Sequence, residues 1–226
     1  MNKNNTILVY AVIIVGLFVL SYFGSSYVGL TVFNFDEDVA GEYNYTGLFG
    51  KIYDFEEVKV GENTRHVLTY KLARPSSDGG FNVIKTAKVP FRYGPEELEE
   101  ISLDYFRNHI LFAESVYITR DKNLEGTEFS PVAIPTIGRI LDSEWDSSVN
   151  LFDIPTLAAS TTVQVDDPVS VISCAQSNEE RMVIELRHGN ENKIYWEEDC
   201  IVMESKNLDD SIKVATAAIY HIMGII

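Results

Sequence analysis

The fold is decided by residues 181–207, which read RMVIELRHGNENKIYWEEDCIVMESKN. Apolar and polar side chains alternate over residues 182–186, a pattern typical of a half-buried strand. The polar run at 188–192 predicts a turn, and residues 194–196 continue as a returning strand. Residues 201–204 predict a further strand. The stretch therefore predicts a compact β-rich module near the C-terminus.

The residues that follow predict a helix that closes this module. Asn207 is a favourable N-cap, and Asp209 and Asp210 suit the positive end of the helix dipole. Lys213 and His221 interrupt the apolar sequence, so we expect a helix that packs on a sheet rather than one that spans a membrane. Residues spaced three or four apart form its apolar face: Ile212, Ala215, Ile219, Ile222 and Ile226.

Further upstream, the sequence predicts a long hairpin. Apolar and polar side chains alternate at 68–72 and again at 81–91, which indicates two half-buried strands. The connection at 74–80 is rich in Pro, Ser and Gly, as turns are. The segment 36–50 is rich in Gly, Tyr, Asn and acids, and we interpret it as a short stalk or an irregular lead-in to the body.

Shorter elements are expected between the hairpin and the C-terminal module. The segment 94–101 favours a helix start, because Pro suits the first helical position and acids suit the first turn. Residues 111–119 and 169–172 predict strands, and a second helix is expected from Pro131 or Pro135 onward. The fold class is therefore α+β: a membrane helix, an exported mixed body, and a β-rich C-terminal module closed by a helix.

The N-terminal segment predicts a membrane anchor. Residues 7–33 are uncharged and largely apolar, which exceeds the roughly 20 residues that a membrane-spanning helix needs. Lys3 precedes the run and acids follow from Asp36, so the positive-inside rule places the N-terminus in the cytoplasm and the body outside. A cleavable signal peptide is the alternative, since Gly24 and Ser26 are small residues at a plausible cleavage site. A type IV pilin fits less well, because the apolar run has no early Glu.

Charge is distributed very unevenly along the chain. The 226 residues carry 18 Lys and Arg against 34 Asp and Glu, and every acid lies from Asp36 onward. Such an acidic body argues against a nucleic-acid partner, because phosphate binding depends on Lys and Arg. A hydrophobic content of 46% argues against a disordered chain. We divide the chain into an anchor at 1–34, a membrane-proximal α+β region at 35–160 and a C-terminal module at 161–226.

The two cysteines, Cys174 and Cys200, fall near the ends of predicted strands in the same module. Exported proteins meet oxidising conditions, so a disulfide between them is the favoured interpretation. Two buried free thiols are the alternative. A catalytic thiol is disfavoured, because no histidine or acid pattern selects either residue.

Two further site candidates rest on spacing alone. Asp142, Glu144 and Asp146 place carboxylates at alternate positions, as calcium loops do, although Ser147 stands where an EF-hand needs Gly. Solvated turn acids are the alternative, and no other cofactor is expected. Asn44 begins an Asn-Tyr-Thr sequon, a candidate for N-glycosylation on the exported side. The four histidines show no metal-binding spacing.

Four motifs resemble a family. They are PEELEEI (95–101), YIT (117–119), IGRI (137–140) and DCIVMESK (199–206). In this order they resemble uncharacterised single-span membrane-anchored proteins of archaea with reduced genomes. The resemblance implies an ectodomain of the cell envelope and no assigned activity, so it supplies no catalytic residue.

Three functions are consistent with these observations. The favoured one is a membrane-anchored extracytoplasmic module that binds or organises envelope components, with lipid contacts through residues 7–33 and membrane or envelope proteins as partners. This function predicts an exposed apolar patch or an open sheet edge. An exported hydrolase would instead gather histidines or carboxylates in a cleft that forms only in the fold. A small-ligand receptor subunit would need an enclosed apolar cavity. Enzymatic activity stays open, with a non-enzymatic role preferred.

Overall fold

The structure is a computed structural model whose chain divides into two units, Met1–Glu37 and Asp38–Ile226. All the described residues belong to the second unit, which is mixed α+β as the sequence predicts. The described residues are 39–75, 80–120, 132–142, 144, 149, 151–161 and 171–226.

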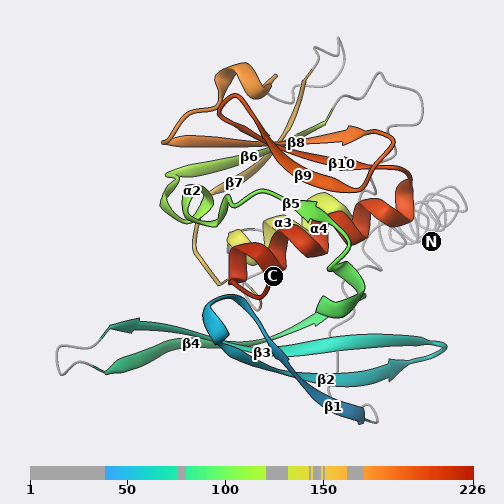
Figure 1. Ribbon diagram of the computed structural model, residues 1–226. Helices are drawn as coiled ribbons and strands as arrows, with labels where there is room; N and C mark the ends of the chain where they lie inside the picture. The colour runs from blue at the N-terminus through green and yellow to red at the C-terminus, as the bar shows by residue number, and fades with distance from the viewer. Residues whose placement is uncertain are drawn as a thin grey trace, which may run out of the picture. The chain divides into compact units, whose positions relative to one another are not determined.

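The first sheet is a four-stranded antiparallel meander in the order β1-β2-β3-β4. β3 and β4 form the long hairpin that the alternating sequence predicts, and β1 is an edge strand (Figure 1). The strands are β1 (Val39–Thr46), β2 (Ile52–Val60), β3 (Asn63–Pro75) and β4 (Phe81–Phe91), with a 3-10 turn η1 (Leu48–Gly50) after β1.

The second sheet has six strands in the order β5-β9-β10-β8-β6-β7. The run from β10 through β8 and β6 to β7 is parallel, whereas β9 is antiparallel to β10 and parallel to β5. The strands are β5 (Ser102–Leu103), β6 (Ser115–Arg120), β7 (Thr156–Ser160), β8 (Arg181–His188), β9 (Lys193–Glu197) and β10 (Cys200–Ser205). The strands expected within 181–207 are confirmed, and β10 lies between the other two.

Helices connect and cover the sheets. Asn207 caps α4 as predicted, since its side-chain oxygen accepts the Asp210 N–H at 2.9 Å. Gly224, with φ of 80°, ends α4 in the left-handed conformation that glycine favours. The helical elements are η2 (Pro95–Leu98), α2 (Arg107–Phe112), α3 (Ala133–Leu141), η3 (Cys174–Gln176) and α4 (Leu208–Met223).

Helix α4 lies between the two sheets (Figure 1), and its contacts join them into one core. On the side of the first sheet, the Tyr220 ring lies 4.6 Å from that of Phe91 and 6.0 Å from that of Phe55. The hydroxyls of Tyr53 and Tyr70 donate to the carbonyl oxygen of Met223 at 3.2 and 3.1 Å. These tyrosines therefore satisfy acceptors that the end of a helix leaves unpaired.

Some sequence predictions were wrong in detail. Residues 39–46 form strand β1 rather than part of an irregular stalk. Leu111 lies in α2, and the predicted strand begins only at Ser115. The buried residues Phe106 and Ile110 lie just before Leu111 and are four residues apart. This helical spacing keeps Leu111 in the helix, in spite of the apolar alternation that follows. Within the predicted strand at 169–172, the described residue Val171 forms only an isolated bridge.

The predicted membrane anchor at residues 7–33 lies outside the described residues. Among the residues that are described, no helix combines the length and apolar character needed to cross a membrane. Helix α4 instead packs against both sheets, as its interrupted apolar sequence predicts. The anchor and its topology stay predictions from the sequence.

Buried His221 predicts a pH-dependent stability. Its Nδ1–H donates to the carbonyl oxygen of Ile226 at 2.8 Å, and its Nε2 accepts the Phe106 N–H at 3.3 Å. Burial lowers the pKa of His221 below its ordinary value of 6.5 and outweighs the hydrogen bond to Ile226, which raises it; the nearby Arg107 charge lowers the pKa further. Below about pH 6.5, His221 therefore becomes protonated in the unfolded chain while it stays neutral in the folded chain.

We expect the free energy of unfolding to fall as pH drops below about 6.5, in addition to the effect of other groups. Urea denaturation between neutral pH and pH 5 measures this slope. A His221→Gln variant is expected to be less stable at neutral pH but to show a shallower slope. Equal slopes in the two proteins would show that His221 is not the responsible group.

Candidate functional site

A cleft beside strand β1 gathers acidic side chains around one histidine. It has a volume of about 610 Å³, and we call it the acidic cleft. Four carboxylates line it, and its described lining contains neither Lys nor Arg. Its lining residues are Gly41, Glu42, Tyr43, Asn44, Glu57, Thr64, His66, Gly94, Glu96 and Glu97.

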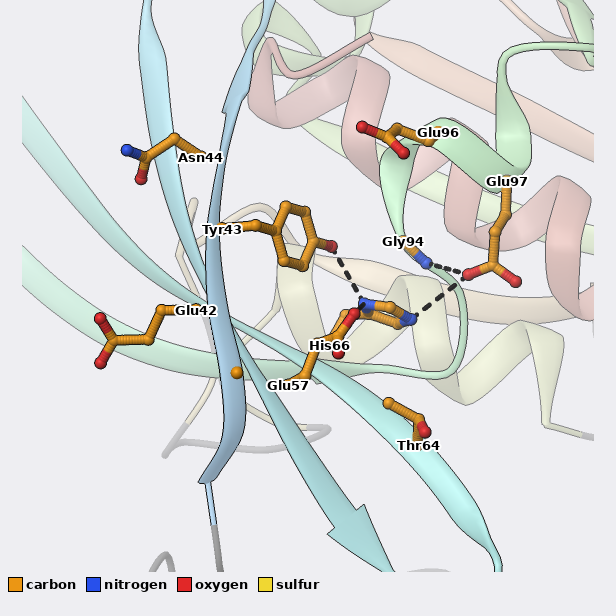
Figure 2. A pocket seen from close by; sticks show the side chains of 10 residues that line it. Glu42, Tyr43, Asn44, Glu57, Thr64, His66, Gly94, Glu96 and Glu97 are labelled. Carbon is orange, nitrogen blue, oxygen red and sulfur yellow. Dashed lines mark hydrogen bonds and ion pairs between the residues drawn. The ribbon is translucent and has the colours of Figure 1, made fainter.

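His66 is the centre of this cleft (Figure 2). It projects from β3, and its side chain is 13% exposed. Its Nδ1 lies 3.0 Å from the hydroxyl of Tyr43, and its Nε2 lies 3.3 Å from a carboxylate oxygen of Glu97. A neutral ring satisfies both contacts when Nε2–H donates to Glu97 and Nδ1 accepts from Tyr43. The imidazole is therefore fixed between a hydroxyl and a carboxylate.

Two local structures position these partners. The Tyr43 ring stacks on Phe55 with ring centroids 5.2 Å apart, which fixes the β1 side chain against β2. Glu97 lies in η2, and its carboxylate also accepts the Gly94 N–H at 2.7 Å. This capping interaction orients the same oxygen that faces His66. The triad Tyr43–His66–Glu97 is thus held by the sheet on one side and by η2 on the other.

Gly94 is required for this close approach. A Cβ atom at Gly94 would lie 2.9 Å from the Tyr43 hydroxyl oxygen and 3.2 Å from the His66 ring. Either contact would force the pair to shift. A Gly94→Ala variant therefore disturbs the geometry of the cleft without changing its charge, which makes it a useful test variant.

The electrostatic field of the cleft is negative. Burial raises the pKa of the Tyr43 hydroxyl well above its ordinary value, and the charges of Glu57, Glu96 and Glu97 raise the pKa further. Tyr43 therefore stays protonated and serves as a hydrogen-bond donor. Burial disfavours any charge, but the part of this effect that comes from the three carboxylates favours a positively charged group in the same space.

The cleft does not present a preformed metal site. Its carboxylates and imidazole do not converge as closely as a metal shell requires. In the described part of the chain, the ligand atoms of only one group of three metal-binding side chains lie within 4.8 Å of one another: Cys174, Glu185 and Cys200. The sulfurs of two of them are joined in a disulfide.

A second cleft, of about 420 Å³, lies near α2 and contains His109 and three carboxylates, Glu114, Glu179 and Glu180. The ring of His109 packs on Trp196, with centroids 4.7 Å apart. No hydrogen bond or ion pair joins His109 to these carboxylates in the described structure. We therefore take the acidic cleft, where the histidine and carboxylate are in contact, as the candidate site.

The predicted disulfide is present. Cys174 of η3 and Cys200 of β10 are bonded, with their Cα atoms 5.1 Å apart. Glu185 and Arg187 of β8 border the bridge, and Arg187 forms ion pairs with Glu185 and with Glu197. These hydrogen bonds raise the pKa of Arg187, so the cation persists beside the bridge. The disulfide thus joins η3 to the centre of the second sheet.

The calcium candidates are only partly described. One carboxylate oxygen of Asp142 accepts the Glu144 N–H at 3.0 Å, and the other accepts the Thr156 N–H at 2.7 Å. Asp142 therefore already organises the turn after α3 and the start of β7. Asp146 lies outside the described residues, so the calcium hypothesis stays a prediction.

Asn44, the sequon residue, lies on β1 and lines the acidic cleft. Figure 2 shows Asn44 and Glu42 pointing away from His66, whereas Tyr43 points toward it. A glycan on Asn44 would therefore lie at the rim of the cleft rather than inside it. The described residues do not test whether the sequon is used.

The fold and the cleft together define a mixed α+β body with an acidic recess along an edge strand. No protein family, curated protein or solved structure matches this chain. The function of the cleft therefore has to be argued from its own residues.

Proposed function

We propose that this protein is a membrane-anchored extracytoplasmic module of the cell envelope whose acidic cleft holds a cationic organic group of a partner. The single observation that supports this most strongly is the composition of the cleft. The carboxylates of Glu57, Glu96 and Glu97, an imidazole and a phenol face about 610 Å³ of space, with Glu42 at the rim (Figure 2) and without a basic side chain in the described lining. Ammonium and guanidinium groups complement such a surface.

An organic cation fits this recess better than a bare metal ion. The acceptors are spread over β1, β2, β3 and η2 instead of converging on one point. The several N–H groups of a lysine or arginine side chain can reach separated acceptors, and the alkyl part can pack on Tyr43. The volume also lies in the usual range for ligand clefts.

An extended peptide segment of the partner is the best candidate to carry this cationic group. Four consecutive residues of β1, 41–44, line the cleft, although their side chains alternate between the faces of the strand. The cleft therefore follows the edge of β1, which pairs only with β2 in the described sheet. An extended segment that pairs with this edge would place every second side chain over the cleft.

The cellular location in this proposal rests on the sequence. Residues 7–33 are uncharged, Lys3 precedes them and acids follow them. This pattern favours a single-pass protein with its body outside the cytoplasm. The resemblance to uncharacterised single-span membrane-anchored proteins of archaea with reduced genomes implies the same location. Membrane lipid around the anchor and envelope or membrane proteins around the body are the proposed partners.

An exported hydrolase is a second candidate, because His66 contacts Glu97 as a general base contacts its orienting carboxylate. The hydroxyl on the other side of His66 belongs to Tyr43, and its raised pKa makes it a poor nucleophile. The geometry therefore supports a binding role better than a catalytic one.

Binding of a lysine-containing peptide tests the proposal. The full chain in detergent is titrated by calorimetry with a peptide that has an acetylated N-terminus and one central lysine. A second peptide, identical except that its lysine side chain is also acetylated, is titrated in the same way. We expect saturable binding of the first peptide alone. Glu97→Gln is expected to weaken it about tenfold, which corresponds to the loss of one charge-assisted hydrogen bond.

Two matched variants separate local contacts from overall charge. Glu198→Gln removes the same charge at an exposed position outside the cleft and is expected to leave the affinity unchanged. Gly94→Ala keeps every charge but displaces Tyr43 and His66, and is expected to weaken binding. Equal effects of Glu97→Gln and Glu198→Gln would mean that only net charge attracts the peptide.

A further inference from the structure

The distal half of the β3–β4 hairpin is largely exposed, although Leu72 still packs against the core. We define the arm as Lys71–Arg74 of β3 and Phe81–Thr86 of β4, and none of its residues is buried. Figure 1 shows the hairpin extending away from helix α4, while the proximal halves of β3 and β4 cover it. A two-stranded ribbon without a packed face is marginally stable in water. We therefore expect the exposed apolar surface of the arm to contact a binding partner.

Large apolar side chains are exposed on the arm. Phe81 is 75% exposed, Val83 is 56% exposed and Ile84 is 48% exposed. A register shift beside Ala73 places Ile84 at a bulge between paired residues. Phe81 and Val83 share one face of the strand, and Ile84 adds a third exposed large hydrophobic side chain within four residues, whereas isolated ones need no explanation.

The arm is also basic within an acidic protein. The described residues of β3 and β4 include no Asp or Glu, and the two strands carry Arg65, Lys71, Arg74, Lys85 and Lys88. Lys88 pairs with Glu56 of β2 at 2.9 Å. In the described structure no ion pair engages Lys71, Arg74 or Lys85. By the register of β3 with β4, Lys71 lies on the same face of the ribbon as Phe81 and Val83. Arg74 and Lys85 lie on the other face, and none of the three cations has a described acidic partner.

We propose that the arm docks on an anionic lipid surface, with its apolar side chains among the acyl chains and its cations at the headgroups. Exposed aromatic and aliphatic residues flanked by Lys and Arg are the usual composition of elements that lie in a membrane interface. This second membrane contact goes beyond the proposed function of the cleft and uses different residues.

A membrane anchor at residues 7–33 would tether the body, and with it the arm, to a bilayer. The chain from Phe33 to Val39 spans at most about 20 Å even when fully extended. The body is thus tethered beside the bilayer, and the tether raises the effective concentration of lipid for a weakly binding arm. The acidic remainder of the body is repelled by anionic headgroups, which favours an orientation with the basic arm toward the lipid.

Depth-dependent quenching of a label on the arm tests this proposal in the full chain. Both native cysteines are in the disulfide, so F81C offers a single site for an environment-sensitive fluorophore. The labelled protein is reconstituted in vesicles of phosphatidylcholine alone or of an equal mixture with phosphatidylglycerol, each containing lipid brominated in the acyl chain. F112C, at a side chain that is 81% exposed on α2, is the control.

We expect the bromolipid to quench the label at position 81 in the anionic vesicles, with little quenching at position 112. The K71Q/R74Q/K85Q variant, or high salt, is expected to return the quenching to the level of neutral vesicles. Absence of quenching at position 81, or equal quenching in neutral and anionic vesicles, would overturn the proposal. The label could instead become protected from aqueous quenchers as protein density rises, with no quenching by bromolipid. That result would show that the arm contacts a second copy of the protein, and it would also overturn the lipid proposal.

Discussion

Replacement of Tyr220 by alanine is expected to reduce the free energy of unfolding by about 3–5 kcal/mol, as for other buried aromatic residues. The Tyr220 side chain is fully buried and packs on Phe55 and Phe91 of the first sheet. Its hydroxyl donates to the carbonyl oxygen of Tyr93 at 2.8 Å. The variant therefore leaves a cavity where α4 meets the first sheet, together with an unpaired carbonyl.

Urea denaturation followed by circular dichroism measures this loss. Tyr220→Phe keeps the ring and removes only the hydrogen bond, so it is expected to cost about 1 kcal/mol. Phe112→Ala removes a ring of similar size that is exposed, and is expected to change stability by less than about 0.5 kcal/mol. If Tyr220→Ala were no more destabilising than Phe112→Ala, α4 would not be the element that joins the sheets.

Loss of the Cys174–Cys200 disulfide is expected to have the next largest effect. The bond closes a loop between residues 26 positions apart, and chain-entropy reasoning assigns such a loop about 3 kcal/mol of stabilisation. A Cys174→Ala/Cys200→Ala variant is therefore expected to unfold at clearly lower urea concentration. Alanine is chosen because Cys200 is fully buried and serine would place a hydroxyl in an apolar site.

The effect of reductant provides the matching control. Reductant is expected to lower the unfolding midpoint of the native sequence and to leave the double-alanine variant unchanged. Mass spectrometry without reduction should also find the peptides of the two cysteines linked. Free thiols at both positions in the purified protein would contradict the disulfide.

Much of the secondary structure could be predicted because the local signals agree. The alternation at 182–186 and the Asn207 cap each correspond to an element of the structure. Strand pairing could not be predicted in the same way. Insertion of β10 between β8 and β9 makes β8 pair in parallel with a strand that is not its neighbour in sequence. Alternation determines which face of a strand is buried, but it does not determine the pairing partner.

The acidic cleft could not be predicted, because its members are distant in sequence. Tyr43, His66 and Glu97 come from β1, β3 and η2, and each has an ordinary local environment. One signal was present: Tyr43 and Tyr45 alternate with polar residues, which indicates a strand rather than a stalk. A strand there would have placed Tyr43 on a sheet face, although its contact with His66 depends on the register of β1 and β3 with β2.

The most direct test of a cation-binding cleft is an NMR titration of the full chain in detergent micelles with the lysine-containing peptide. The ring resonances of His66 and Tyr43 report on the cleft, while His109 and His188 serve as internal references. The proposal predicts saturable shifts at His66 and Tyr43 that are absent with the acetylated peptide and strongly reduced in Glu97→Gln. Shifts of equal size at all four side chains, or none at His66 and Tyr43, would contradict it.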